Sequence, residues 1–221
     1  MVGKIIKWAL IGSFIVVGVY FCWAIYQIMA WGAPYSSKKE LIANYQEKHS
    51  EIATLKRYFY SIVPDSLDVY IEYEEDNNID LKVYRKPADP ANPFPTVVLF
   101  QEWNIDPYNY QPDSNAIGLS QDYTFQQTVQ LLNWNDDTFR QIKRYLDKAN
   151  CISVTNGDPA QIGFRRSGLG MYFYKLFDHP LTDSLQKVYN DSCSHILFNE
   201  SVALEYGGGA VGPQCFPDAK E

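Results

Sequence analysis

The sequence predicts an α+β fold, in which an N-terminal transmembrane helix precedes one domain with a mainly antiparallel sheet packed by helices. A long apolar run fills residues 8–30. Apolar and polar residues alternate through residues 67–84, as in strands with one buried face. Apolar residues recur at helical spacing in residues 41–62 and 136–148. Helices and strands that do not alternate regularly along the chain are typical of α+β proteins.

The first element is the apolar run, WALIGSFIVVGVYFCWAIYQIMA. A helix rises about 1.5 Å per residue, so this run is long enough to cross about 30 Å of hydrocarbon. It is also longer than the apolar core of a signal peptide. We therefore expect an uncleaved signal-anchor over residues 1–31. A cleaved signal is the alternative, with Ala30-Trp31-Gly32 as the small-residue site.

Lysines flank both ends of the run almost equally, so their number does not decide the orientation. Two other features do. The short N-terminal tail cannot form a domain, and three of the four cysteines lie beyond the run. We therefore expect a single-pass membrane protein with residues 32–206 outside the cytoplasm as an α+β domain. Residues 207–221 begin with three glycines, which predicts a flexible C-terminal tail.

A long helix is expected next. Residues 37–40 read SKKE, a capping box in which the Ser37 hydroxyl accepts a backbone N–H and the glutamate reaches back. The apolar stripe that follows is interrupted at Lys48, and Pro64 ends the helix. We expect it to pack on its own sheet, with a membrane-proximal coiled-coil dimer as the alternative.

The alternating pattern over residues 67–74 and 79–84 predicts a β-hairpin with one buried and one wet face. Residues 96–100 form a short, continuous apolar run, which indicates a central strand. A polar and aromatic loop over residues 104–120 follows, and loops of this length tend to be functional.

The rest of the chain mixes both kinds of element. Helical spacing predicts helices over residues 125–132, 136–148 and 181–189. Turn residues separate predicted strands over residues 152–155, 162–165, 171–177 and 196–198.

Three cysteines follow the membrane segment, so one internal disulfide is the most that they can form. We expect Cys193–Cys215, which would fix the glycine-rich tail, with Cys151–Cys193 as the competing pair. Catalysis by a thiol is the sharper alternative, but no CxxC spacing and no nearby histidine supports it.

The charge balance excludes one class of partner. The chain has 26 acidic and 19 basic residues, a net charge of −7. Nucleic acids would be repelled, so we expect no nucleic-acid partner. The three histidines have no metal-ligand spacing and the glycines match no phosphate-binding motif, so no metal and no cofactor is predicted.

Glu102-Trp103 lies between the strongest strand and the long loop, which adds Tyr108 and Tyr110. A carboxylate beside an aromatic platform suits glycan binding or glycoside hydrolysis. Hydrolysis would need a second carboxyl group from the region after the strand, namely Asp106, Asp113 or Asp122. The plainer alternative is a surface acid beside a tryptophan at the rim of the core.

Arg165-Arg166 is a second candidate binding pair, because two guanidinium groups can grip a carboxylate or phosphate. The alternative is that both arginines pair with the excess acid of the domain. His179 beside Asp178 could be an oriented base, but no nucleophile motif accompanies it.

The order of elements resembles that of type IV pilins and pseudopilins: an N-terminal apolar helix, an amphipathic helix, an antiparallel sheet and a C-terminal disulfide. In that family a glycine precedes a phenylalanine, and a glutamate lies five residues into the mature helix. Here residues 5–12 read IIKWALIG, without that glutamate, and Gly32 and Pro34 break the helix. The resemblance is therefore one of layout, without the family's signature.

These features together predict an anchored domain that binds a partner and is not an enzyme. The partner would be an envelope protein, a glycan or another copy of the chain. A membrane-tethered surface hydrolase using Glu102 with a loop aspartate is the first alternative, and a pilin-like structural or assembly component is the second.

Overall fold

The computed structural model of this 221-residue chain describes residues 18–23, 36–87, 97–111, 122–168, 170–208, 212 and 214–217. Of the predicted signal-anchor, only residues 18–23 are among these, and they are helical. The other residues of that segment lie outside the described part of the chain. Within the described ranges, no helix has both the length and the apolar character needed to cross a bilayer.

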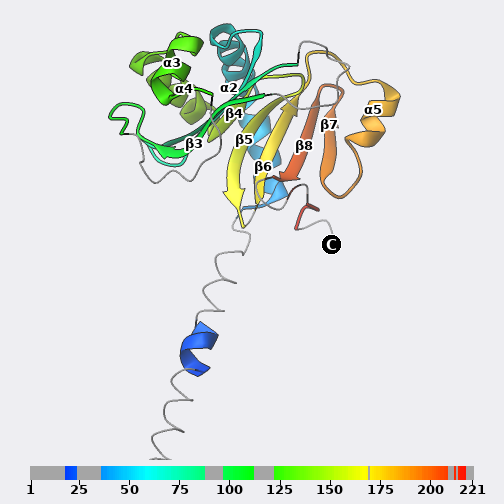
Figure 1. Ribbon diagram of the computed structural model, residues 1–221. Coiled ribbons are helices and arrows are strands. Elements are labelled where there is room, and N and C mark those ends of the chain that lie inside the picture. The colour runs from blue at the N-terminus through cyan, green and yellow to red at the C-terminus, as the bar shows by residue number, and fades with distance from the viewer. Residues whose placement is uncertain are drawn as a thin grey trace, which may run out of the picture.

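The domain is α+β, as predicted, with one sheet of eight strands in the order β3-β2-β1-β4-β5-β6-β8-β7 (Figure 1). Every neighbouring pair is antiparallel. The strands are β1 (Leu67–Tyr73), β2 (Ile79–Arg85), β3 (Val97–Ile105), β4 (Ser153–Thr155), β5 (Ala160–Ser167), β6 (Gly170–Leu176), β7 (His195–Asn199) and β8 (Val202–Gly207).

Four helices accompany the sheet in the described domain: α2 (Lys38–Ile62), α3 (Phe125–Leu132), α4 (Asp136–Ala149) and α5 (Asp183–Val188). The predicted capping box is present at the start of α2, where Ser37 Oγ accepts the Glu40 N–H and the Glu40 carboxylate accepts the Ser37 N–H. The interruption predicted at Lys48 is a kink, since Lys48 has φ −114° and ψ 16°. The sequence therefore predicted the start of this helix and the position where its apolar stripe breaks, but not the bend.

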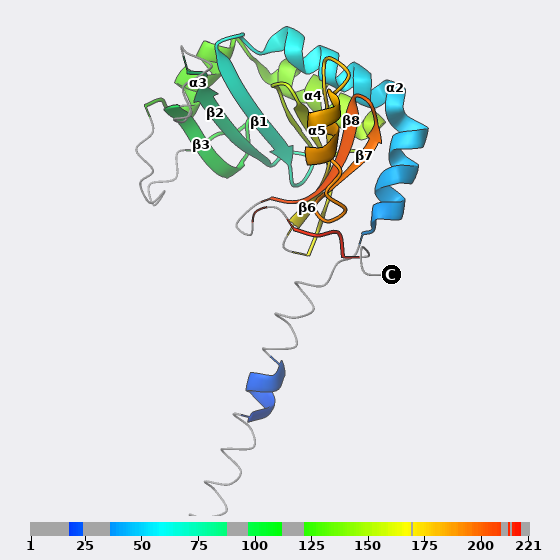
Figure 2. The same ribbon diagram turned by 90° about the vertical axis from the view of Figure 1, so that its right-hand side faces the viewer.

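The core lies between the sheet and helices α2 and α4, which share one side of it (Figure 2). Leu55 and Phe59 of α2 and Val69 and Ile71 of β1 are fully buried there. Because successive side chains of a strand point to opposite faces, the residues between them point away from the helices. This alternation confirms the hairpin with one buried face that the sequence predicted over β1 and β2, but the face predicted to be wet is buried at Glu72 and Asp80.

The prediction of a central strand over residues 96–100 is wrong, because β3 is an edge strand. Leu99 and Phe100 are both fully buried, although they are neighbours. The pairing of β3 with β2 shifts register near Val83, and such an irregularity lets adjacent side chains both face inward. A continuous apolar run therefore marks an irregular edge here.

Strand β8 was not predicted. All six of its residues are buried, because it lies between β6 and β7. Such a strand shows no alternation to recognise. Gly207, the predicted first residue of the tail, is the last residue of β8.

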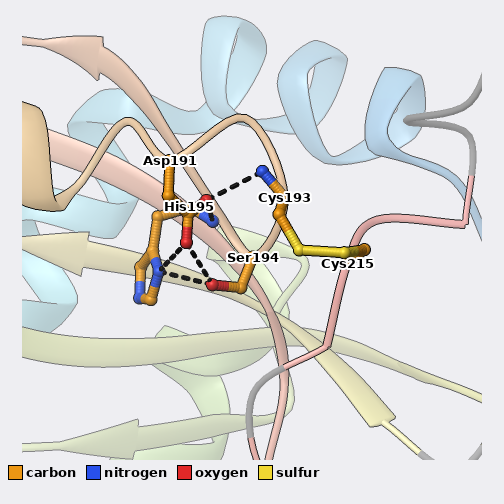
Figure 3. The surroundings of a disulfide bond; sticks show 5 residues. All are labelled: Asp191, Cys193, Ser194, His195 and Cys215. Carbon is orange, nitrogen blue, oxygen red and sulfur yellow. Dashed lines mark hydrogen bonds and ion pairs between the residues drawn. A yellow bond between two sulfur atoms is a disulfide. The ribbon is translucent and has the colours of Figure 1, made fainter.

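The predicted disulfide between Cys193 and Cys215 is confirmed (Figure 3). The competing Cys151–Cys193 pair is wrong, since Cys151 is a buried free thiol. Beside the bond, Phe216 is 1% exposed. Its ring lies 5.9 Å from that of Tyr172, and its N–H donates to the Cys193 carbonyl. Packed structure therefore continues beyond Gly207 into residues 214–217.

Candidate functional site

The side of the sheet away from α2 and α4 carries the best candidate site. We call this surface the open face. It is defined by outward-pointing side chains of β1, β2 and β3 and one from β5: Tyr70, Glu72, Asp80, Lys82, Trp103 and Arg166. The alternation that buries Val69 and Ile71 on the core side places Tyr70 and Glu72 here.

A charged cluster occupies part of the open face. Glu72 and Asp80 lie opposite one another on β1 and β2, and both are almost fully buried. Arg166 Nε and one terminal nitrogen contact the two Glu72 carboxylate oxygens at 2.6 and 2.7 Å. The same arginine lies 3.9 Å from Asp80. One guanidinium thus joins two carboxylates that would otherwise repel one another.

Burial shifts the pKa values of two groups in this cluster. Burial raises the pKa of Asp80, although the hydrogen bond from the Asn104 N–H, 3.0 Å long, acts in the opposite direction. Burial and the neighbouring Glu72 carboxylate also raise the pKa of Tyr70, whose hydroxyl donates to Glu72. Tyr70 therefore stays a protonated donor, and burial makes Asp80 costly to ionise.

Beside this cluster an ammonium group lies between two aromatic rings. Lys82 Nζ is 5.0 Å from the centre of the Tyr70 ring and 5.8 Å from that of Trp103. Trp103 is 51% exposed. In the described part of the chain no carboxylate lies within 4 Å of Lys82 Nζ. An exposed indole and a cation without an ion-pair partner thus lie side by side.

Glu102 and Trp103 do not form the combined site that the sequence predicted. Trp103 lies on the open face, whereas Glu102 is opposite Leu81, on the core side of the sheet. The Tyr110 hydroxyl donates to Glu102 at 3.0 Å, and the Tyr110 ring stacks on the core residue Phe125. Burial, with Glu102 alongside, raises the pKa of Tyr110 to about 12. Neighbours in a strand point to opposite faces, which separates the carboxylate from the aromatic platform.

Arg165 and Arg166 are separated in the same way. Arg166 lies on the open face. Arg165 pairs in register with Tyr172, which lies on the core side of the sheet and whose hydroxyl donates to the Ser36 carbonyl oxygen. The Arg165 guanidinium lies 4.8 Å from the Phe164 ring centre. The two arginines therefore cannot grip one ligand as a pair. The alternative expected both to pair with acid, but among the described residues only Arg166 has a carboxylate within 4 Å.

The loop after β3 contributes little to the open face. Asp106 is held in its own turn, where it accepts the N–H groups of Tyr108 and Asn109. Tyr108 lies under the Arg140 guanidinium, 4.9 Å away, in a shallow pocket. That pocket is lined by Asp76, Asn77, Tyr108, Arg140, Lys143 and Arg144.

The pocket does not make an anion site. Arg140 pairs with Asp136 and Asp137, and Lys143 pairs with Asp76. Its cations are thus largely neutralised by carboxylates of the same surface.

A serine beside a histidine, which sequence reasoning missed, lies near the disulfide (Figure 3). Ser194 Oγ is 2.8 Å from His195 Nδ1, and His195 Nε2 is 3.7 Å from Glu205. The Ser194 hydroxyl donates to Asp191 at 2.6 Å and is itself buried, so it is not directed at a substrate. These contacts brace strand β7 and do not form a nucleophile site.

Four residues of the open face were not among the predicted site residues: Tyr70, Glu72, Asp80 and Lys82. Their alternation in the hairpin already indicated one shared wet face, but their partner Arg166 is 94 residues from Glu72. No local pattern encodes a contact at that separation. No group of three potential metal ligands occurs in the described ranges.

Comparison of the chain with protein-family models, with curated proteins and with solved structures finds no match in any of the three. The case for the open face therefore depends on its own geometry: an exposed indole, a neighbouring cation, and two buried carboxyl groups held by one arginine.

Proposed function

We propose that this chain is a single-pass, membrane-anchored protein whose extracytoplasmic domain binds a ligand on the open face. One observation carries the proposal: Trp103 is 51% exposed, and Lys82 lies over its ring on the side of the sheet away from α2 and α4. Exposed aromatic rings with a convergent polar neighbour are typical of binding surfaces. The ion pair between the buried Glu72 and the half-exposed Arg166 supports this surface by joining β5 to β1.

Two features support the anchor and the compartment. The apolar run over residues 8–30 has the length and composition of a membrane span. The Cys193–Cys215 disulfide supports an oxidising compartment, since disulfides persist outside the reducing cytosol.

Neither alternative function gains support from the geometry. Glu102 hydrogen-bonds to Tyr110, and Asp106 accepts hydrogen bonds in its own turn. Asp113 lies outside the described residues. The surface hydrolase and the pilin-like component both stay predictions.

The proposal is tested by lysine footprinting on sealed cells that express the full chain. A membrane-impermeant N-hydroxysuccinimide ester labels amines, and mass spectrometry then compares Lys82 with Lys148. Lys148 is a matched control, because it also lies over an aromatic ring, 5.9 Å from the centre of Tyr145, but on α4. The same labelling is repeated on the full chain purified into lipid nanodiscs.

We expect Lys148 to be labelled equally in cells and in nanodiscs, and Lys82 to be labelled less in cells. Labelling of Lys148 would support a domain outside the cytoplasm, and protection of Lys82 would support an occupied open face. Equal labelling of Lys82 in both settings would contradict ligand binding there. An unlabelled Lys148 in sealed cells would contradict the orientation.

A further inference from the structure

We infer that the ligand of the open face is a saccharide, whose ring stacks on Trp103 while Lys82 donates to its oxygens. This inference rests on the proposed function and names the chemical class of the ligand. It follows from the chemical groups that lie close together on the open face, an indole ring and an ammonium group.

The first argument is the aromatic platform. The Lys82 ammonium lies over the Trp103 ring, and the exposed half of Trp103 leaves ring surface for a ligand. A sugar ring presents flat patches of C–H groups, and their slight positive polarisation suits the negative face of an aromatic ring. The indole is the largest such face among the side chains.

The second argument is the polar surround. A saccharide needs hydrogen-bond partners close to the stacking ring, because each hydroxyl that loses water must be satisfied again. The Lys82 ammonium can donate three hydrogen bonds and has no carboxylate within 4 Å in the described part of the chain. It therefore lies where substituents of a stacked ring would be.

The third argument separates a saccharide from a protein partner. Protein interfaces bury about 800 Å² on each side around a core from which charged residues are depleted. Here Lys82 lies beside Trp103, and Asp80 and the Glu72–Arg166 pair lie on the same face of the sheet. An exposed indole on a face with this many polar and charged groups fits a polar ring better than an apolar protein surface.

The experiment is an array of neutral and carboxylate-bearing oligosaccharides probed with the full chain in lipid nanodiscs, since sugar-headed detergents would compete. Any saccharide found is then titrated against wild type and variants. Trp103→Ala and Lys82→Ala test the two contacts, and Trp103→Phe keeps an aromatic face. Lys148→Ala is the matched lysine control. Thermal unfolding of each variant checks that the domain is folded.

We expect a saccharide, neutral or acidic, to bind wild type and Lys148→Ala alike. Trp103→Ala should weaken binding roughly tenfold or more, as expected for loss of a central aromatic contact, and Trp103→Phe should weaken it less. Lys82→Ala should also weaken binding. These losses should occur without a change in the unfolding temperature.

Three results would overturn the inference: no saccharide bound, binding unaffected by Trp103→Ala, or equal losses in Lys148→Ala and Lys82→Ala. If the array is negative while Lys82 is protected in cells, the open face binds a ligand of another class, such as a protein. That outcome would leave the proposed function standing and reject the saccharide.

Discussion

Asp80 is a carboxyl group whose ionisation is opposed by its burial in the folded domain. Its side chain is 3% exposed and faces Glu72 across the hairpin. Burial raises its pKa from the ordinary value of 3.8. A carboxyl group with a raised native pKa binds its proton more tightly in the folded state, so stability is lost as the pH rises through that raised value.

Replacing Asp80 with asparagine should therefore stabilise the domain at neutral pH. The amide oxygen can still accept the Asn104 N–H, and the Glu72–Arg166 pair is untouched. We expect a gain on the order of 1 kcal/mol, the scale of one hydrogen bond. Urea unfolding at several pH values should show the difference from wild type vanishing below pH 3.8 and opening as the pH rises.

The control for this variant is Asp106→Asn. Hydrogen bonds from Asn109 and the Tyr108 N–H lower the pKa of Asp106, so its substitution should shift stability in the opposite direction. Destabilisation by Asp80→Asn at neutral pH that disappears in acid would contradict this account and show that the carboxylate is needed in its charged form.

At the scale of single residues, the sequence predicted which residues belong to the candidate site better than which of them lie together. Trp103 and Arg166 were both predicted as ligand-binding candidates, and both lie on the open face. Their sequence neighbours Glu102 and Arg165 were predicted with them but lie elsewhere. Adjacency in sequence suggested a shared site, whereas the alternation of a strand enforces separation.

Among the elements, β7 shows how a sheet edge is protected. The N–H groups of His195 and Leu197 donate to side chains of the preceding loop, Asp191 and Asn190. Burial pushes the pKa of Asp191 up, but hydrogen bonds from Ser194 and from the N–H groups of His195 and Cys193 outweigh it and lower the pKa. Unpaired edge groups invite pairing with another chain, so these contacts also limit aggregation.

Asp191→Ala should expose this edge. We expect a loss of about 1 kcal/mol at neutral pH, because a carboxylate 39% exposed is partly screened by water. A lowered native pKa contributes stability above pH 3.8 that is lost as the pH falls through the lowered value, so the difference should close in acid. Urea unfolding and light scattering would measure both effects.

The exposed Asp65 supplies a control, and Asp65→Ala should change neither stability nor scattering. If Asp191→Ala scatters no more light than that control, the loop side chains do not protect the edge.

Elements with a single wet face were predictable, and the others were not. Helix α4 and the β1–β2 hairpin show clear periodicity, and the structure places them as expected. Strand β8 is buried on both faces and β3 has a shifted register, so neither presents the period that sequence reasoning detects. Both errors arise because burial and strand pairing depend on tertiary contacts, which the local sequence does not reveal.

For the whole molecule, the disulfide fixes the C-terminal segment to the sheet. Cys193 and Cys215 are 22 residues apart. Reduction should lower the free energy of unfolding by about 3 kcal/mol on the chain-entropy model. Urea unfolding with and without a reductant measures this difference in free energy. The free energy of unfolding of Cys193→Ser should not change when reductant is added. An unchanged stability on reduction would mean that Phe216 alone holds the segment.

Cys151 should behave differently from the bonded pair. Burial raises the pKa of its thiol, so it is held protonated and away from solvent. Alkylating reagents should leave it unmodified in the native domain and modify it after unfolding. Rapid modification of Cys151 in the folded state would contradict the packing of this part of the core.

The central claim is an anchored domain in an oxidising compartment, and non-reducing mass spectrometry of the protein from membranes of an expressing cell tests it most directly. Intact mass reports whether residues 1–31 are retained, and peptide mapping after thiol blocking reports the cysteines. We predict a full-length chain with Cys193 joined to Cys215 and Cys151 free. A full-length chain with every thiol free would contradict the account and place the domain on the reducing side of the membrane.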